Sequence, residues 1–278
     1  MKPVVYAALL ISLMILGACS TPSPSSRYAL ARDRAPERDI DASHIPDAVP
    51  RHEPRSRHGN PSSYVVRGKR YYVLANAKGF VERGIASWYG KKFHGHSTSS
   101  GEPFNMYAMT AAHTRLPLPT YVRVTNLKNH RSVVVRVNDR GPFHANRIID
   151  LSYAAAKKLG ITAAGTGMVE IRAIDPDNPR AAPVVAAHKT AEAGKLALNE
   201  SEVNLYLQVG AFVSQQNAQS LQARLQRQFH SLSISAAYYQ AQRLYRVRIG
   251  PLSSVAEADR LSRSLSEHGF PHSHVVLD

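Results

Sequence analysis

The side chains best able to do acid–base chemistry are the five carboxylates in residues 79–174. Asp139 closely follows the strand-like run 131–137, in a turn that Gly141-Pro142 ends, so a rigid strand end would point it outwards. Glu102 lies in a Gly-flanked loop, Ser100-Gly-Glu-Pro-Phe104. Carboxylates held in this way can act as general acids and bases. The remaining three are Glu82, Asp150 and Glu170.

The charges around Asp139 decide whether it can carry a proton. Three arginines near it favour its ionised form and so oppose proton donation: Arg136, Arg140 and Arg147. A second carboxylate held close would push one of the two acids towards protonation. We therefore expect Glu102 and Asp139 to form a coupled pair. The structural alternative is that Asp139 accepts backbone N–H bonds in its own turn, while Arg140 pairs with Asp150.

Aromatic and histidine side chains surround these acids in the sequence. Trp88 and Tyr89 would suit the face of a sugar ring, and core packing is the alternative for Trp88. His113 could hydrogen-bond a carboxylate or a sugar, or be an ordinary buried histidine. His94 and His96, with His113 and Asp139, can also be drawn as a metal site, but His-x-His spacing is a weak signal.

The elements that must position these residues are mostly short strands. Runs 120–126 and 131–137 flank a segment typical of a hairpin loop, and 168–174 predicts a closing strand. Residues 150–160 predict one short helix, with Ser152 as N-cap and Gly160 as its stop. Short strands with a single helix in residues 79–174 indicate a small closed barrel.

Residues 203–278 predict a second unit with the order β-α-β-β-α-β. The strands are expected at 205–212, 233–239, 244–249 and 275–277, with Gly250-Pro251 ending the third. Apolar residues recur at helical spacing in the two segments between them. This order is that of a small α+β ferredoxin-like domain.

The N-terminal region predicts export and a tether. Lys2, a short apolar run and small residues before Cys19 form a secretory signal over residues 1–18. Cys19 is the only cysteine, so no disulfide can form within the chain. Residues 19–62 hold seven prolines and few apolar side chains, which predicts a flexible tether. A β-hairpin is expected in 63–78 and a second linker in 175–202.

The net charge of +15 suits an anionic partner, such as nucleic acid, anionic lipid or an acidic polysaccharide. Predicted export argues against nucleic acid, and no nucleic-acid motif stands out. General surface charge for solubility is the alternative for most of these cations.

Four motifs in order resemble the catalytic domain of the rare lipoprotein A family, whose members are bacterial cell-wall lytic transglycosylases with a double-psi β-barrel. They are Gly84-Ile-Ala-Ser-Trp-Tyr-Gly90, Ser100-Gly-Glu-Pro-Phe104, Thr110-Ala-Ala-His113 and Val137-Asn-Asp-Arg-Gly-Pro-Phe143. Leu16-Gly-Ala-Cys19 resembles the lipoprotein processing box, and Ser20 after it is typical of an outer-membrane destination. Residues 203–278 resemble the sporulation-related repeat, a peptidoglycan-binding domain.

The resemblance implies an activity and roles for particular residues. The expected enzyme cleaves between muramic acid and glucosamine in peptide-stripped glycan at the division septum, leaving 1,6-anhydro ends. Asp139 is expected to be the acid/base, with Glu102 and His113 as active-site partners and Arg140 as a substrate contact. Expected glycan contacts in the second domain are Gln208 and Arg246. The resemblance implies no metal and no cofactor.

Two other functions are compatible with the sequence. Barrels of this shape also bind polysaccharide without cutting it, so the chain could be a non-catalytic glycan-binding outer-membrane lipoprotein. A metal-dependent hydrolase that uses His94 and His96 is the third hypothesis.

Overall fold

The computed structural model describes residues 30–177 and 203–278. The predicted signal peptide, the proposed lipidation site Cys19 and most of the predicted linker 175–202 lie outside the described residues. Within the described ranges, no helix has the length and apolar character needed to cross a membrane.

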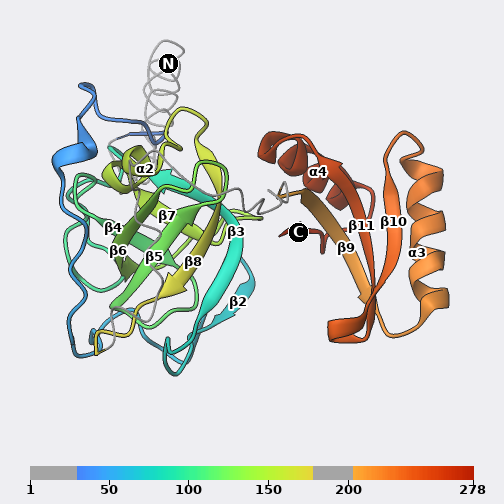
Figure 1. The fold of residues 1–278 in the computed structure, drawn as a ribbon, viewed down its shortest axis with the longest axis horizontal. Helices are drawn as coiled ribbons and strands as arrows, with labels where there is room; N and C mark the ends of the chain where they lie inside the picture. The colour runs from blue at the N-terminus through green and yellow to red at the C-terminus, as the bar shows by residue number, and fades with distance from the viewer. Residues whose placement is uncertain (1–29, 178–202) are drawn as a thin grey trace, which may run out of the picture. The chain divides into compact units, whose positions relative to one another are not determined.

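Six strands close into the predicted barrel (Figure 1). Its interior is filled by fully buried branched side chains, among them Val122, Val135 and Ile171. This confirms a double-psi β-barrel as the first domain. Around the barrel the order is β3 (Val81–Tyr89), β7 (Ile149–Ser152), β4 (Thr110–His113), β6 (Ser132–Asp139), β5 (Thr120–Asn126) and β8 (Thr166–Ala173).

The helix expected at 150–160 is shorter than predicted. Helix α2 spans Tyr153–Leu159, where the Ser152 side chain caps its N-terminus and Gly160 ends it with φ of 72°. Both predicted caps are therefore confirmed. Asp150, however, lies in strand β7 rather than in the helix, because β7 pairs with both β3 and β4. This difference places a carboxylate on the barrel wall.

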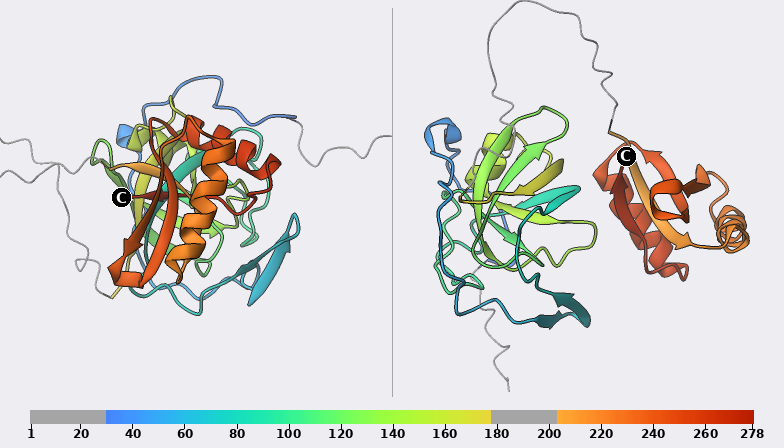
Figure 2. Two further views of the ribbon diagram at one scale, coloured as in Figure 1. Left: turned by 90° about the vertical axis from the view of Figure 1, so that its right-hand side faces the viewer. Right: turned by 60° about the horizontal axis from the view of Figure 1, so that its bottom comes forward.

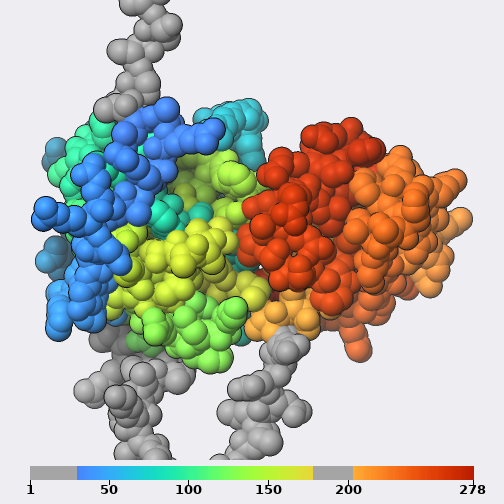
Figure 3. Space-filling model, turned by 90° about the horizontal axis from the view of Figure 1, so that it is seen from above, coloured from blue at the N-terminus to red at the C-terminus, as the bar shows by residue number. Residues whose placement is uncertain are grey.

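Residues 33–60, here called the N-terminal strap, lie along the outside of the barrel (Figure 3). Asp33 accepts hydrogen bonds from the Gly90 and Lys92 amides at 2.7 and 3.0 Å. Asp47 accepts from the Val134 amide at 2.9 Å. The prediction of a tether reaching residue 62 is therefore wrong for this segment. Ile40 and Ile45 of the strap also pack against the barrel core, so the strap docks through both polar and apolar contacts.

A hairpin follows the strap, as predicted. Strands β1 (Ser63–Val66) and β2 (Lys69–Tyr72) pair in antiparallel register and extend away from the barrel wall (Figure 2). The turn residues Arg67 and Gly68 have φ of 50° and 78°. Two consecutive positive φ values suit the tight turns that join paired strands.

The second domain has the predicted ferredoxin-like topology. Its sheet has the order β10 (Ile234–Tyr239), β11 (Leu244–Leu252), β9 (Leu205–Phe212) and β12 (His274–Leu277). Helices α3 (Gln215–Gln228) and α4 (Val255–Glu267) supply apolar side chains to its core, including Leu225 and Leu265. The expected end of β11 at Gly250 is wrong, because an irregularity in the pairing lets the strand continue to Leu252.

Candidate functional site

Two carboxylates lie in one row across the barrel wall. Ala112 in β4 pairs with Asp139 in β6 on one side and with Asp150 in β7 on the other. Asp150 in turn pairs with Ser87 in β3. Paired residues of neighbouring strands share a face, and the alternate residues Ala111 and Val137 fill the interior. The two acids therefore lie on the outer face of the barrel.

A β-bulge in β6 makes this arrangement possible. Thr110 pairs with Arg136 and Ala111 with Val137, but Ala112 pairs with Asp139, so Asn138 is an extra residue. In a regular strand Arg136 and Asp139, three positions apart, would face opposite sides. The extra residue brings both to the outer face, as bulges next to active sites commonly re-aim a side chain.

The Asp139 carboxylate is held through one of its oxygens. Oδ1 accepts hydrogen bonds from the backbone N–H and hydroxyl of Ser99 and from the Arg140 amide, each at 2.7 Å. The turn interaction expected as the alternative for Asp139 is thus present. Because all three donors hydrogen-bond to Oδ1, Oδ2 is the oxygen available to a bound substrate.

Glu102 is held by an arginine and an amide. Arg136 Nη1 donates to Oε1 and Oε2 of Glu102 at 2.9 and 2.7 Å, and Asn138 Nδ2 donates to Oε2 at 2.9 Å. Burial would raise the pKa of Glu102, but these donors outweigh it and lower the pKa. Glu102 is therefore an ionised acceptor at neutral pH, not the proton-holding partner expected from the sequence.

Asp150 is the site acid whose pKa is raised. Burial raises the pKa of Asp150 most, the hydrogen bond from Ser87 and the charges of Arg147 and His144 oppose this, and the charge of Asp139 raises it further. The acid with the raised pKa is thus Asp150, which lies across Ala112 from Asp139, and not Glu102, which the sequence had suggested as the partner of Asp139.

Tyr89 extends the site with a hydroxyl. Its ring stacks on Phe104 at 4.0 Å and is buried, so it is not an exposed platform. Burial raises the pKa of Tyr89, and the charges of Asp139 and Asp150 add to the rise. Within the described part of the chain its hydroxyl has no hydrogen-bond partner. A buried donor without a partner marks a place where a ligand could complete the hydrogen bonding.

Three other predicted site residues have structural contacts. Trp88 packs edge-on against Tyr153 at 5.4 Å. His113 is 1% exposed, and its Nδ1 accepts from the Arg115 and Leu116 amides at 3.1 and 3.0 Å while Nε2 faces Glu82. Burial lowers the pKa of His113, so the ring is neutral. His113 therefore shapes the chain after β4 rather than touching Asp139.

Arg140 has its guanidinium directed into the protein. It donates to the carbonyl oxygens of Gly59, His113 and Leu116 at 2.7, 3.0 and 2.5 Å, and to the Asn60 side chain at 3.1 Å. Through these hydrogen bonds Arg140 links the strap to the segment 113–116 at the end of β4. The expected pairing with Asp150 is not observed, and the role as a substrate contact stays a prediction.

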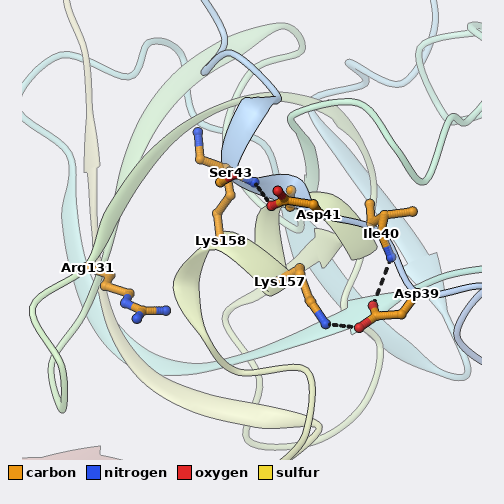
Figure 4. Close-up of a pocket in the computed structure, with 8 residues that line it drawn as sticks. Asp39, Ile40, Asp41, Ser43, Arg131, Lys157 and Lys158 are labelled. Carbon is orange, nitrogen blue, oxygen red and sulfur yellow. Dashed lines mark hydrogen bonds and ion pairs between the residues drawn. The ribbon is translucent and has the colours of Figure 1, made fainter.

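Two other features of the barrel domain are alternatives to the acid pair, the histidines 94 and 96 and a surface pocket. Among residues 30–177 and 203–278 no cluster of three or more metal-ligating side chains occurs, and His94 Nδ1 instead accepts from the Met106 amide at 3.2 Å. A pocket of about 640 Å³ lies between the strap and α2 (Figure 4). Its lysines are already neutralised, since Lys157 pairs with Asp39 and Lys158 with Asp47.

In the second domain, the predicted glycan contacts lie on one face of the sheet. Gln208 in β9 pairs with Arg248 in β11, and its Oε1 has no partner among the described residues. Arg246, on the same face as Arg248, lies over the ring of Tyr239 at 4.7 Å. Arg248 Nη1 donates to Asp278 and to the Tyr239 hydroxyl, whereas its Nε and Nη2 have no partner among the described residues. The roles of Gln208 and Arg246 as glycan contacts stay predictions.

Asp150 is the site residue that sequence reasoning missed. Its segment was interpreted as helix, which hides an alternation across Ile149, Asp150 and Leu151. In a strand, this pattern buries the two apolar residues and points the acid to the other face. Strand β6 shows the same alternation, with valines at 133, 135 and 137, and it could have indicated that residues 149–151 are a strand.

The two described domains are thus a double-psi barrel with acids on its outer wall and a ferredoxin-like domain. A family model described as "Lytic transglycolase" matches residues 81–171, and one described as "SPOR domain" matches 201–275. The endolytic peptidoglycan transglycosylase RlpA of Pseudomonas aeruginosa (strain UCBPP-PA14) is 39% identical in an alignment that covers 92% of this chain and 91% of the relative.

Two further relatives carry the same name. RlpA of Vibrio cholerae is 57% identical over 175 residues, or 63% of this chain, and the match spans 65% of that relative's length. RlpA of Neisseria meningitidis serogroup A is 44% identical over 222 residues, which cover 79% of this chain and 86% of the relative. The chain therefore belongs to the RlpA family of endolytic peptidoglycan transglycosylases.

The contacts of Arg140 predict a structural role that can be tested. Arg140→Lys removes the forked donor set and leaves buried carbonyls unpaired, so the free energy of unfolding should fall by about 2 kcal/mol. Urea unfolding followed by the fluorescence of Trp88, the only tryptophan, reports on the barrel. Arg131→Lys, at an exposed hairpin residue, is the matched control. Unchanged stability with weakened glycan binding would instead make Arg140 a substrate contact.

Proposed function

We propose that this chain cleaves peptide-stripped peptidoglycan strands by lytic transglycosylation, with the Asp139–Asp150 pair supplying the proton. The observation that carries the proposal is the placement of the two acids on either side of Ala112. Burial raises the pKa of Asp150 and the charge of Asp139 adds to the rise, which favours a retained proton on Asp150 beside the Asp139 carboxylate. Family membership supplies the reaction class.

The reaction needs the acid pair to give one proton to the glycan and then to take one back. In the first step the pair protonates the oxygen that bridges muramic acid C1 to glucosamine, and that bond breaks as the C1 centre gains oxocarbenium character. The C6 hydroxyl of the same muramic acid then forms a bond to C1 and gives its proton to the carboxylate. The product is a 1,6-anhydro end, and no water is consumed. Asp139 Oδ2 is the oxygen we assign to both transfers.

The remaining site residues orient the acid and the glycan. Ser99 fixes the rotation of the Asp139 carboxylate, and Glu102, kept ionised by Arg136, is suited to accept hydrogen bonds from sugar hydroxyls. The Tyr89 hydroxyl is a donor near both acids. His113 acts at a distance, by holding the chain whose carbonyls receive Arg140.

The preference for stripped strands rests on charge. Removing the peptide leaves a lactyl carboxylate on each muramic acid, and a chain of net charge +15 would attract such a polymer. Gln208 and Arg246 in the SPOR domain are the proposed glycan contacts, with Arg246 pairing with a lactyl carboxylate.

The chain acts in the cell envelope, as its family and SPOR domain indicate. We further propose that Cys19 is lipidated and anchors it in the outer membrane, and that the SPOR domain concentrates it at the septum, where amidases expose stripped glycan. The support for the anchor is the sequence Leu16-Gly-Ala-Cys19-Ser20.

The reaction is tested by its products. Mass spectrometry of stripped and intact peptidoglycan, incubated with the Ser20–Asp278 protein, should show anhydro-muramyl ends from the stripped strands. Asp139→Asn should lower their formation at least 100-fold, because loss of a general acid costs about 10²–10⁴ in rate. Reducing ends would identify a hydrolase, and binding without cleavage would identify a non-catalytic glycan-binding lipoprotein.

The acid pair predicts a pH effect of a definite sign. Burial raises the pKa of Asp150 and the charge of Asp139 adds to the rise, so removing this proton donor in Asp150→Asn should move the alkaline limb of the rate profile to lower pH and reduce the rate at pH 7. Rates on soluble stripped glycan between pH 4 and 9 measure it, with Asp41→Asn, an exposed strap acid, as control. An alkaline limb that stays in place in Asp150→Asn would show that the acids are not coupled.

The SPOR domain predicts a binding effect separate from cleavage. Arg246→Ala should weaken binding of the full chain to stripped glycan about tenfold through loss of a charge-assisted contact. Arg260→Ala on α4 removes the same charge away from that sheet face. Equal loss in both variants would assign the binding to net charge instead.

A further inference from the structure

Arg136 lies between two carboxylates from different segments of the first domain, Glu53 of the strap and Glu102 of the loop before β4. Its Nε donates to Oε1 and Oε2 of Glu53 at 3.0 and 3.2 Å, and its Nη2 donates to Oε2 at 2.7 Å. Only Nη1 addresses Glu102. Glu53 of the strap therefore binds the Nε–Nη2 edge of the guanidinium, and Glu102 of the site binds Nη1.

Glu53 is itself firmly held. The Tyr121 hydroxyl and Arg51 Nε donate to its Oε1. The hydrogen bonds from Arg136 are the main cause that lowers the pKa of Glu53 to about 2, so it is ionised throughout the neutral range. The Glu53 and Arg136 side chains are only 16% and 18% exposed, which limits screening of the pair by solvent.

The geometry of the Arg136 guanidinium explains how Glu53 can affect Glu102. A guanidinium has five N–H donors in a fixed plane, so fixing Nε and Nη2 also fixes where Nη1 points. Without Glu53, Arg136 could turn and offer its two-pronged edge to Glu102, which would displace that carboxylate. We propose that Glu53 is a positioning residue of the active site: by occupying Nε and Nη2 of Arg136, it sets the place of the Glu102 carboxylate.

Two further strap contacts reach the same region. Ser56 Oγ donates to the Ser100 carbonyl at 3.0 Å, in the loop whose Ser99 holds Asp139. Gly59 and Asn60 receive Arg140, the residue after Asp139. Strap residues 53–60 thus buttress both Glu102 and Asp139, although they precede the matched barrel segment, 81–171, in sequence. The functional catalytic unit includes this strap.

The inference rests on the proposed function, and its test separates positioning from anchoring. Glu53→Gln keeps the size of the side chain but loses the charge that holds Arg136. Asp47→Asn is the matched control, because Asp47 also fastens the strap to the barrel domain, through the Val134 amide of β6 and through Lys158 of α2. Kinetics of the Ser20–Asp278 protein on soluble stripped glycan should show a kcat lowered at least tenfold in Glu53→Gln, with KM changed less than threefold. Asp47→Asn should keep kcat within twofold.

A second variant tests the route through Arg136. Arg136→Lys loses the fork, so it should lower kcat as Glu53→Gln does, and the double variant should be no worse than the worse single one. Multiplied effects, or equal kcat losses in Glu53→Gln and Asp47→Asn, would overturn the inference. A kcat retained within twofold in Glu53→Gln would overturn it as well.

A readout independent of activity covers the case in which the proposed function fails. Rotation of the Arg136 guanidinium, measured by ¹⁵N NMR of arginine side chains, should be restricted in the wild type and in Asp47→Asn, and released in Glu53→Gln. An inactive wild type with this pattern would overturn the proposed reaction and leave the positioning intact. Unrestricted rotation in the wild type would overturn the positioning itself.

Discussion

The β-bulge at Asn138 is the constraint on which the site depends. Strand β6 must bury valines at 133, 135 and 137 in the barrel, and that alternation would turn Asp139 into the core. One extra residue changes the phase after Val137, so the barrel keeps its packing while Asp139 reaches the outer face. The bulged residue is used as well, because its side-chain amide holds Glu102.

Outside the barrel, the protein separates its acids by the partners it gives them. Glu53 and Glu102 share an arginine and have lowered pKa values, whereas burial raises the pKa of Asp150 and the charge of Asp139 adds to the rise. The difference lies in burial and in local partners, not in residue type. A site of this kind can therefore contain ionised acceptors beside a carboxyl group with a raised pKa.

Much of the fold followed from local patterns. The hairpin of β1 and β2, strands β5 and β6, both caps of α2 and the order of the second domain all depend on turn residues and periodicity that neighbouring residues determine. The strap did not follow, because a proline-rich composition excludes a core of its own but not docking through aspartates and glutamates. The β-bulge depends on pairing between β4 and β6, which no local pattern records.

The sequence selected candidate acids but did not show which of them lie side by side. Asp139 and Glu102 were selected from strand-end and loop positions, yet Asp150 was assigned to a helix, so its place across Ala112 from Asp139 was missed. The roles assigned to His113 and Arg140 by resemblance overlook that their polar atoms are committed to backbone and side-chain partners of the chain itself. Which acids meet is decided by strand order in the closed barrel.

The most direct test of this account is a crystal structure of the Asp139→Asn protein with a stripped glycan tetrasaccharide. We predict a glycosidic oxygen between muramic acid and glucosamine within hydrogen-bond distance of the residue 139 side chain, with Asp150 on the other side of Ala112. A glycan bound elsewhere on the barrel, with no glycosidic oxygen near either position, would contradict it.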